Sequence, residues 1–183
     1  MAKRIIKAYG NLTNRIEEGN NYNKDKQIHV GDDITMYHWS DRTCYYVTDV
    51  INQKHIKVKR YHVCADRSKG GGQGHQNWLL FKTKKEEHEY LKQFFPERSE
   101  YDDVIKEAPE EEWVFRYGKW KQAHKYSPED LDAENMFGVK LRDVYFTESD
   151  IKKLEAGKDV YKYTDLSGAI SFGIRDYYYD WSF

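Results

Sequence analysis

The tetrapeptide Trp39-Ser40-Asp41-Arg42 combines an aromatic ring, a hydroxyl group, a carboxylate and a guanidinium group within four residues. As a turn, Ser40 and Asp41 would accept hydrogen bonds from nearby backbone N–H groups, with Trp39 covering the core. As a recognition patch, Trp39 would stack on a base and Arg42 would bind a phosphate or carboxylate. In the first interpretation Arg42 needs a carboxylate partner, and the candidates are Asp41, Asp176 and Asp180. The two interpretations are compatible if the turn lies at the rim of a binding surface.

A basic segment follows this turn. Ile56 and Val58 alternate with Lys57 and Lys59, a pattern typical of a strand with one buried face and one face in water. Cations that neutralise phosphates and aromatic rings that stack on bases together form surfaces that bind nucleic acid. A solvated face without a binding role is the alternative. The candidate binding residues are Trp39, Arg42, Lys54, Lys57, Lys59, Arg60, Tyr61, Arg67 and Lys69, with Tyr37 as a further aromatic.

Charge is unevenly distributed along the 183 residues, although the formal net charge is only −1. Residues 1–85 contain 16 Lys and Arg against 8 Asp and Glu, whereas residues 86–112 contain 3 against 11. The asymmetry suggests an anionic partner for the basic part. The acidic segment is either a solvated helix face or a mimic of nucleic acid that occupies a basic groove of a protein. Its candidate residues are Glu86, Glu87, Glu89, Asp102 and Asp103.

Catalytic and metal chemistry have weaker signals. A nuclease would use histidines, and the candidates are His38, His55 and His62. His62 and Cys64 alternate on one strand, but no Cys-x-x-Cys or His-x-x-x-His pair accompanies them. Further possible ligands are Cys44, His55 and His75. The glycine-rich loop at 65–76 lacks the Gly-Lys-Ser/Thr ending of a phosphate-binding loop. We therefore predict no metal, no cofactor and no catalytic residue, and two cysteines are too few for a disulfide framework.

A sheet is needed to position these residues. Runs rich in β-branched and aromatic residues, separated by short turns, predict an antiparallel meander. The predicted strands are 34–39, 43–50, 55–63, 77–82, a hairpin over 113–123, 139–146, 159–164 and 169–174. Capping signals and apolar spacing predict helices. These begin at Lys3, Thr83, Ser99, Ser127 and Thr147.

The chain is expected to form one folded domain over residues 1–183, because 16 Tyr, 8 Phe and 5 Trp supply a large buriable surface. No apolar run approaches the roughly 20 residues that cross a bilayer, and the start lacks the apolar region of a secretion signal. We therefore expect a cytoplasmic protein that does not enter membranes. The expected parts are an N-terminal helix and loop (1–29), barrel strands (30–82), an acidic helical insert (83–112), a barrel hairpin (113–123), a second insert (124–165) and a closing strand with an aromatic tail (166–183).

Three segments together resemble a family of small, mostly uncharacterised proteins of bacteriophages and prophages. The first is VGDDITMYHWSDRTCYYVTDVINQKHIKVKR, with its Gly-Asp pair and its Trp-Ser-Asp-Arg motif. The others are EWVFRYGKWKQ, which resembles an Arg-x-x-Gly-x-Trp hairpin, and ISFGIRDYYYDWSF, which resembles a Tyr-Tyr-Asp-x-x-Phe ending. The match covers about half of the chain, and residues 83–112 and 124–165 look like elaborations.

The Gly-Asp pair followed by short twisted strands also resembles an SH3-like or Tudor-like small antiparallel β-barrel. We therefore expect an α+β fold built from such a barrel with helical insertions. The family resemblance implies a phage accessory protein that blocks a host defence ribonucleoprotein. Most specifically, it implies an anti-CRISPR inhibitor of Cas9–guide RNA. The alternatives are an enzyme that cleaves guide RNA or DNA, and a structural or morphogenetic phage protein. Whether the partner surface is protein, RNA or DNA stays open, as does the oligomeric state.

Overall fold

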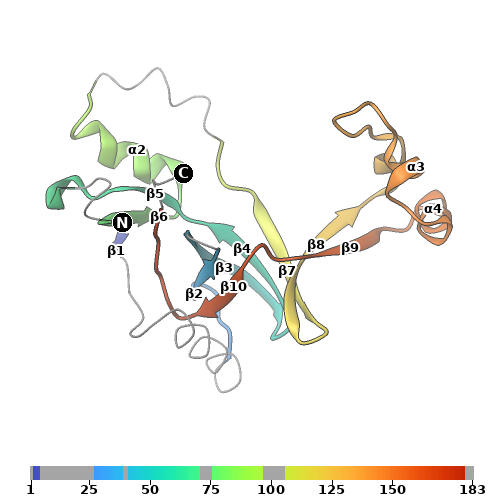
Figure 1. The fold of residues 1–183 in the computed structure, drawn as a ribbon, viewed down its shortest axis with the longest axis horizontal. Coiled ribbons are helices and arrows are strands. Elements are labelled where there is room, and N and C mark those ends of the chain that lie inside the picture. Colours follow the sequence, from blue (N-terminus) through green and yellow to red (C-terminus); the bar gives the residue numbers. More distant parts are fainter. Residues whose placement is uncertain (1, 5–26, 39–40, 71–75, 97–105, 180–183) are drawn as a thin grey trace. The chain divides into compact units, whose positions relative to one another are not determined.

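The structure is a computed structural model that describes residues 2–4, 27–38, 41–70, 76–96 and 106–179. It consists mostly of antiparallel β-sheet with a few short helices, which places it in the expected α+β class (Figure 1). The chain divides into two compact units, Met1–Glu111 with Leu166–Phe183, and Glu112–Asp165. Because parts of the first unit precede and follow it in the sequence, the second unit is inserted into the chain of the first. A single domain over residues 1–183 was expected.

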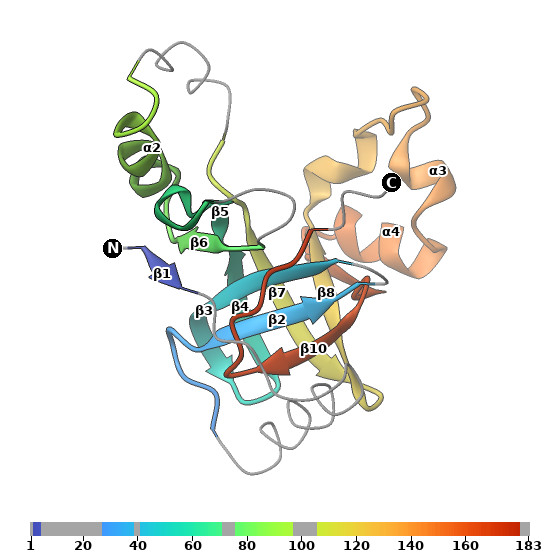
Figure 2. The same cartoon turned by 60° about the vertical axis from the view of Figure 1, so that its left-hand side comes forward.

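The main sheet of the first unit is the predicted meander, extended by a strand from the end of the chain. Its neighbours run antiparallel in the order β10-β2-β3-β4. The strands are β2 (Asp33–Tyr37), β3 (Arg42–Asn52), β4 (His55–Arg60) and β10 (Ala169–Phe172). Figure 2 shows β10 lying along β2. The register pairs Met36 with Ile170 and Val47 with Val58, so apolar residues from distant segments share the core.

A second, three-stranded sheet in this unit corrects the barrel prediction. It has the order β1-β6-β5, from β1 (Lys3–Arg4), β5 (His62–Ala65) and β6 (Trp78–Phe81). The predicted strand 55–63 is thus split at Tyr61, and strand 77–82 pairs with its second half. Among the described residues the sheets are not closed into a barrel, so the expected closure is not found and the SH3-like fold is not confirmed. Alternation along a strand shows which face is buried, but it does not show which strand will pair with it.

Lys3 and Arg4 also correct a helix prediction, because they form a strand paired with β6. The rest of the predicted helix over 3–18 lies outside the described residues.

Helix α2 (Lys84–Lys92) begins where its capping signal placed it, since Thr83 Oγ1 accepts a hydrogen bond from Glu86 N at 3.2 Å. The glycine-rich loop contains a short 3-10 helix, η1 (Arg67–Lys69). The predicted helix after Ser99 falls largely on undescribed residues, and residues 106–109 are not helical.

The second unit is built on a three-stranded antiparallel sheet in the order β7-β8-β9. Its strands are β7 (Glu110–Arg116), whose first two residues belong to the first unit, β8 (Lys119–Tyr126) and β9 (Val160–Asp165). The β7–β8 hairpin turns at Tyr117 and Gly118, as predicted. Both residues have positive φ angles, 53° and 79°, which the tightest hairpin turns require.

Three short helical segments connect β8 to β9. They are η3 (Pro128–Asp132), α3 (Leu141–Val144) and α4 (Glu148–Glu155). The capped helix predicted after Thr147 is confirmed as α4. The strand predicted over 139–146 is wrong, because residues 141–144 are helical. Tyr145 and Phe146 instead pack against Tyr126, at 5.4 and 5.1 Å between ring centroids, so tertiary contacts override the β-propensity of this run. None of the helices formed by the described residues has the length and apolar character that a membrane crossing requires.

Candidate functional site

Arg42 is held by a buried carboxylate, as the turn interpretation predicted. Its Nη1 donates to Asp176 Oδ2 at 2.9 Å, and Asp176 is fully buried. The guanidinium also lies over the ring of Tyr178, 5.4 Å from the ring centroid. Trp39 and Asp180 lie outside the described residues, so their predicted roles stay predictions. This arrangement favours a structural role for Arg42, which connects β3 to the C-terminal segment through Asp176.

A second polar group surrounds Asp33, at the start of β2. Tyr61 donates its hydroxyl proton to Asp33 Oδ1 at 2.6 Å, and Arg175 Nη1 contacts Asp33 Oδ2 at 2.5 Å. Lys3 Nζ donates to the same Tyr61 oxygen at 3.0 Å. Burial, followed by the hydrogen bond to Asp33, raises the pKa of the Tyr61 hydroxyl. Tyr61 is only 2% exposed, which corrects its assignment as a stacking surface residue. Tyr37 is buried as well.

Further hydrogen bonds connect β2 and β3 to the C-terminal segment. Thr35 Oγ1 donates to Ile174 O at 2.7 Å and accepts from Asp176 N at 2.9 Å. Cys44 Sγ donates to Asp176 O at 2.8 Å, and burial raises the pKa of this thiol. All of these bonds join β2 and β3 to residues 174–176. Asp33, Thr35, Arg42 and Cys44 are therefore linked to residues 174–176 by a network of hydrogen bonds and ion pairs.

The predicted alternation of buried and partly exposed residues along β4 is confirmed. Ile56 and Val58 are fully buried, whereas Lys57 and Lys59 lie on the opposite, partly exposed face. Lys57 is partly neutralised, because Glu110 Oε2 lies 3.7 Å from its Nζ and exposed Asp49 lies opposite it in the register. Lys54 and Arg60 are exposed. We use the name β4 cationic face for the cations along this strand, Lys54, Lys57, Lys59 and Arg60; Lys54 lies in the turn before β4, and Arg60, at the end of the strand, alternates to the side of Val58.

Arg67 and Lys69 do not belong to the same strand surface. They lie on η1, after β5, and both are exposed. The backbone N–H of Arg67 donates to Tyr90 of α2 at 2.9 Å, and its guanidinium lies 5.2 Å from the ring centroid of Phe95. These contacts place η1 against α2 and the segment that follows it. The structure therefore separates the predicted basic residues into a strand group and a loop group.

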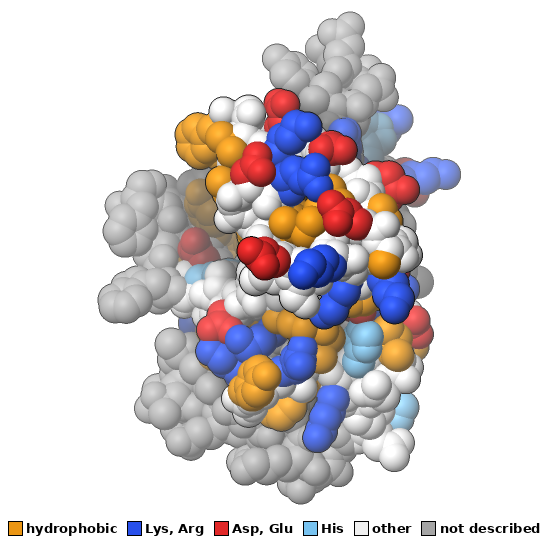
Figure 3. All heavy atoms as spheres, turned by 90° about the vertical axis from the view of Figure 1, so that its right-hand side faces the viewer, with side chains coloured by type: hydrophobic (Ala, Val, Ile, Leu, Met, Phe, Trp, Pro, Cys, Tyr) orange, Lys and Arg blue, Asp and Glu red, His pale blue; other side chains and the backbone are white. Residues whose placement is uncertain are grey.

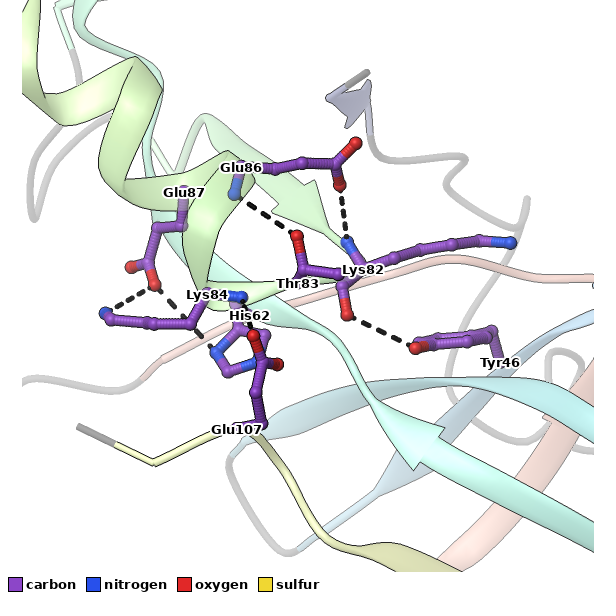
Figure 4. Close-up of polar contacts among 8 residues, drawn as sticks. All are labelled: Tyr46, His62, Lys82, Thr83, Lys84, Glu86, Glu87 and Glu107. Atoms are coloured by element: carbon purple, nitrogen blue, oxygen red, sulfur yellow. Dashed lines mark hydrogen bonds and ion pairs between the residues drawn. The ribbon is translucent and has the colours of Figure 1, made fainter.

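The three candidate histidines lie at three different places, the end of β2, the start of β4 and the start of β5. His38 Nε2 lies 3.0 Å from Thr43 Oγ1, and burial lowers the pKa of His38 although nearby Asp41 opposes the shift. His62 has two acidic neighbours, as Figure 4 shows: Glu107 Oε2 is 3.0 Å from its Nε2, and Glu87 Oε2 is 3.9 Å from its Nδ1. The His62 side chain is only 10% exposed, which leaves little room for a substrate.

Two of the carboxylates on α2 are bound by neighbouring groups of the protein. Glu87 is buried and pairs with Lys84 Nζ at 2.6 Å, which corrects its assignment to an exposed acidic surface. Glu86 Oε2 accepts a hydrogen bond from Lys82 N at 3.2 Å, at the start of α2 (Figure 4). Glu89 is exposed. Asp102 and Asp103 lie outside the described residues. Of the acidic candidates that are described, Glu89 therefore best fits a role in contacting a partner.

Both cysteines are free thiols that lie in the buried interior. Cys64 packs with Leu79 and Phe81, and burial raises the pKa of its thiol to about 12. At neutral pH it is therefore protonated, whereas nucleophiles and metal ligands are thiolates. The described residues contain no group of three or more His, Cys, Asp or Glu side chains placed to hold a metal ion. His75 is not among them.

A cationic and aromatic face on the second unit was missed by sequence reasoning. Arg116 stacks on Tyr163, with 4.3 Å between its Cζ and the ring centroid. Lys119 and Lys121, on the same face of β8, both pair with Asp165. The sequence signal that could have indicated this face is the spacing of two residues between Lys119 and Lys121, which places both side chains on the same side of a strand. On the face drawn in Figure 3, basic, acidic and hydrophobic side chains are interspersed, and the local ion pairs agree with this mixture.

Comparisons of the chain with protein-family models, with curated proteins and with solved structures gave no match.

Proposed function

We propose that this chain acts by binding, as a phage accessory protein that inhibits a nucleic-acid-handling defence complex of the host. The most specific form of the proposal is an anti-CRISPR protein that binds Cas9 with its guide RNA in the host cytoplasm. The β4 cationic face would contact the nucleic-acid backbone. We also propose that the SH3-like or Tudor-like resemblance is limited to the meander β2–β3–β4, which carries this face.

One observation favours the β4 cationic face over the lysines of β8 on the second unit. Lys59 and Arg60 form no ion pair with any residue that the structure describes, while Ile56 and Val58 hold the strand in the core. Cations without a carboxylate partner can neutralise phosphates without first breaking an internal pair. Neutralising phosphates releases counterions, which favours binding at low salt. By contrast, Lys119 and Lys121 share Asp165.

The test reverses charge on this face in the whole protein. Lys57→Glu with Lys59→Glu leaves Ile56 and Val58 in place, so the fold should be retained, and circular dichroism checks this. The matched control is Lys152→Glu with Lys153→Glu, which makes the same charge change on exposed positions of α4. Inhibition of DNA cleavage by purified Cas9–guide complex should fall by about tenfold or more in the β4 variant, because attractive contacts become repulsive. The control should inhibit like the wild type.

Salt dependence gives an independent measurement. The logarithm of the association constant should fall linearly with the logarithm of salt concentration, by about 0.9 for each phosphate contacted on duplex DNA and about 0.7 on a single strand. The β4 variant should have a shallower slope. Unchanged inhibition and an unchanged slope in the β4 variant would exclude the nucleic-acid contact. If Glu89→Lys then abolishes inhibition, the acidic surface contacts the protein part of the complex.

The alternative of an enzyme has one observation in its favour, the placement of His62 between Glu87 and Glu107. A carboxylate beside a histidine can orient the imidazole for proton transfer. Incubation of the purified protein with guide RNA or DNA tests this alternative directly. Cleavage that His62→Gln abolishes would replace the binding proposal with a nuclease.

A further inference from the structure

Two large apolar side chains are exposed to solvent on one turn of the second unit. Met136 is 89% exposed and Phe137 is 81% exposed, whereas Leu131, a few residues earlier, is buried. They lie between η3 and α3, in residues 133–140, which we call the Met136–Phe137 turn. Scattered exposed apolar residues are ordinary, whereas contiguous exposed apolar surface marks interaction sites, and Met136 and Phe137 are adjacent. These residues were not among the candidates from the sequence.

The turn is held in one conformation by its own hydrogen bonds. Asn135 Oδ1 accepts from Phe137 N at 2.9 Å and from Val139 N at 3.1 Å. Asn135 N donates to Val139 O at 2.9 Å, and Gly138 N donates to Asn135 O at 3.0 Å. Gly138 has a φ of 71°, a conformation that glycine adopts without steric cost. A partner would therefore not have to order this backbone, which lowers the entropic cost of binding.

The base of the turn is attached to the core of the second unit. Leu141 N donates to Ala133 O at 2.8 Å, so the two ends of the turn are joined. Leu131, just before the turn, belongs to a buried cluster with Leu154 and Val160. The exposed tip is thus carried on a packed base, and substitutions at Met136 or Phe137 remove no core contact.

The surroundings of the turn are acidic. Residues 127–157 contain eight Asp and Glu against four Lys and Arg, a net charge of −4. Lys140, at the end of the turn, and Arg142, just after it, are neutralised, since Lys140 Nζ lies 3.1 Å from Asp132 and Arg142 Nη2 lies 3.0 Å from Glu155. Such a surface repels phosphates, and therefore disfavours nucleic acids and anionic membranes. It complements an apolar pocket with a basic rim.

We propose that the Met136–Phe137 turn is a docking element that inserts into an apolar pocket, rimmed by Lys and Arg, on a basic partner protein. A phenylalanine supplies a large rigid contact area, and a flexible methionine adapts to the shape of the pocket. The site is distinct in residues and in ligand from the β4 cationic face, so it stands independently of the proposed function. A ribonucleoprotein with a basic protein surface offers ligands for both.

The experiment places a photoreactive benzoylphenylalanine at position 137 of the full chain, produced in bacterial cells. The matched control carries the same residue at Tyr117, which is 87% exposed in the same unit. After irradiation, position 137 should form a discrete adduct with a basic protein, identified by mass spectrometry, that position 117 does not form. An adduct with nucleic acid or with a second copy of this chain, or equal labelling from both positions, would overturn the proposal.

The identified protein is then purified and its affinity for the chain is measured by titration. Phe137→Ser should weaken binding at least tenfold, whereas Tyr117→Ser should change it less than twofold. Both variants should keep the wild-type melting temperature, because neither side chain is buried. Wild-type affinity in Phe137→Ser would also refute the docking element. Failure of the β4 charge reversal to affect inhibition would count only against the nucleic-acid interface, so the two proposals fail separately.

Discussion

At the scale of single residues, loss of the Arg42–Asp176 pair should lower the stability of the fold substantially. A fully buried carboxylate needs a compensating charge, because transfer of an ion out of water is unfavourable. Arg42 supplies that charge across 134 residues of sequence, and Tyr178 covers the guanidinium. The pair therefore contributes to stability mainly by preventing Asp176 from being buried alone.

Arg42→Met should lower the free energy of unfolding by about 3 kcal/mol, near the lower end for a broken buried pair because Arg42 keeps 26% of its side-chain surface exposed. Urea denaturation measures this change. Arg142→Met is the matched control, since the Arg142–Glu155 pair is surface-exposed and should contribute under about 1 kcal/mol. Equal losses in the two variants would contradict the structural role of the Asp176 pair.

At the scale of elements, the start of α4 is held by a reciprocal capping box. Thr147 Oγ1 accepts from Asp150 N at 3.2 Å, while Asp150 Oδ2 accepts from Thr147 N at 3.1 Å and from Lys162 Nζ at 2.5 Å. Hydrogen bonds from Lys162, and then from Thr147, lower the pKa of Asp150 from 3.8 to about 2. The carboxylate thus joins the helix start to β9.

Because its folded pKa is lowered, Asp150 stabilises the fold above its unfolded pKa and loses this effect as pH falls. Wild-type stability of the second unit should therefore decline between about pH 4 and pH 2 through this group. Asp150→Asn should be less stable by about 1 kcal/mol at pH 7 and should show a flatter decline. Urea titrations over this pH range, followed by circular dichroism, measure both slopes. Parallel pH curves for the two proteins would contradict the assignment.

At the scale of the whole molecule, the chain has two compact units with hydrophobic clusters of their own. One cluster contains Cys44, Tyr46, Tyr61 and Leu80, and the other contains Leu131, Leu154 and Val160. Regions with separate packed cores often open as separate cooperative units. A defect in one core should therefore leave the other largely protected.

Leu154→Ala removes a fully buried side chain from the second unit and should cost about 2–5 kcal/mol locally. Hydrogen exchange followed by mass spectrometry should show faster exchange in α4 and β9, with β2, β3 and β4 unchanged. Val58→Ala, at a fully buried position of the first unit, is the reciprocal variant and should show the opposite pattern. Faster exchange over the whole chain in both variants would show that the molecule unfolds as one unit.

The sequence by itself determined the features that depend on near neighbours. The meander over β2, β3 and β4, the turn at Tyr117 and Gly118 and the caps of α2 and α4 all follow from patterns within a few residues. Side-chain alternation and capping hydrogen bonds act over short separations, so the local sequence contains the whole interaction. The partly exposed lysines of β4 belong to this group, and so they could be named as candidates in advance.

Only the tertiary structure decided which distant partners these elements met. The choice of Asp176 for Arg42, the burial of Tyr61 against Asp33 and the placement of Glu87 and Glu107 beside His62 depend on contacts between separate elements. The same holds for the split of the third predicted strand and for the sheets, which do not close into a barrel over the residues that the structure describes. A local pattern specifies a buried face but not the surface that covers it, because burial is a property of the assembled chain.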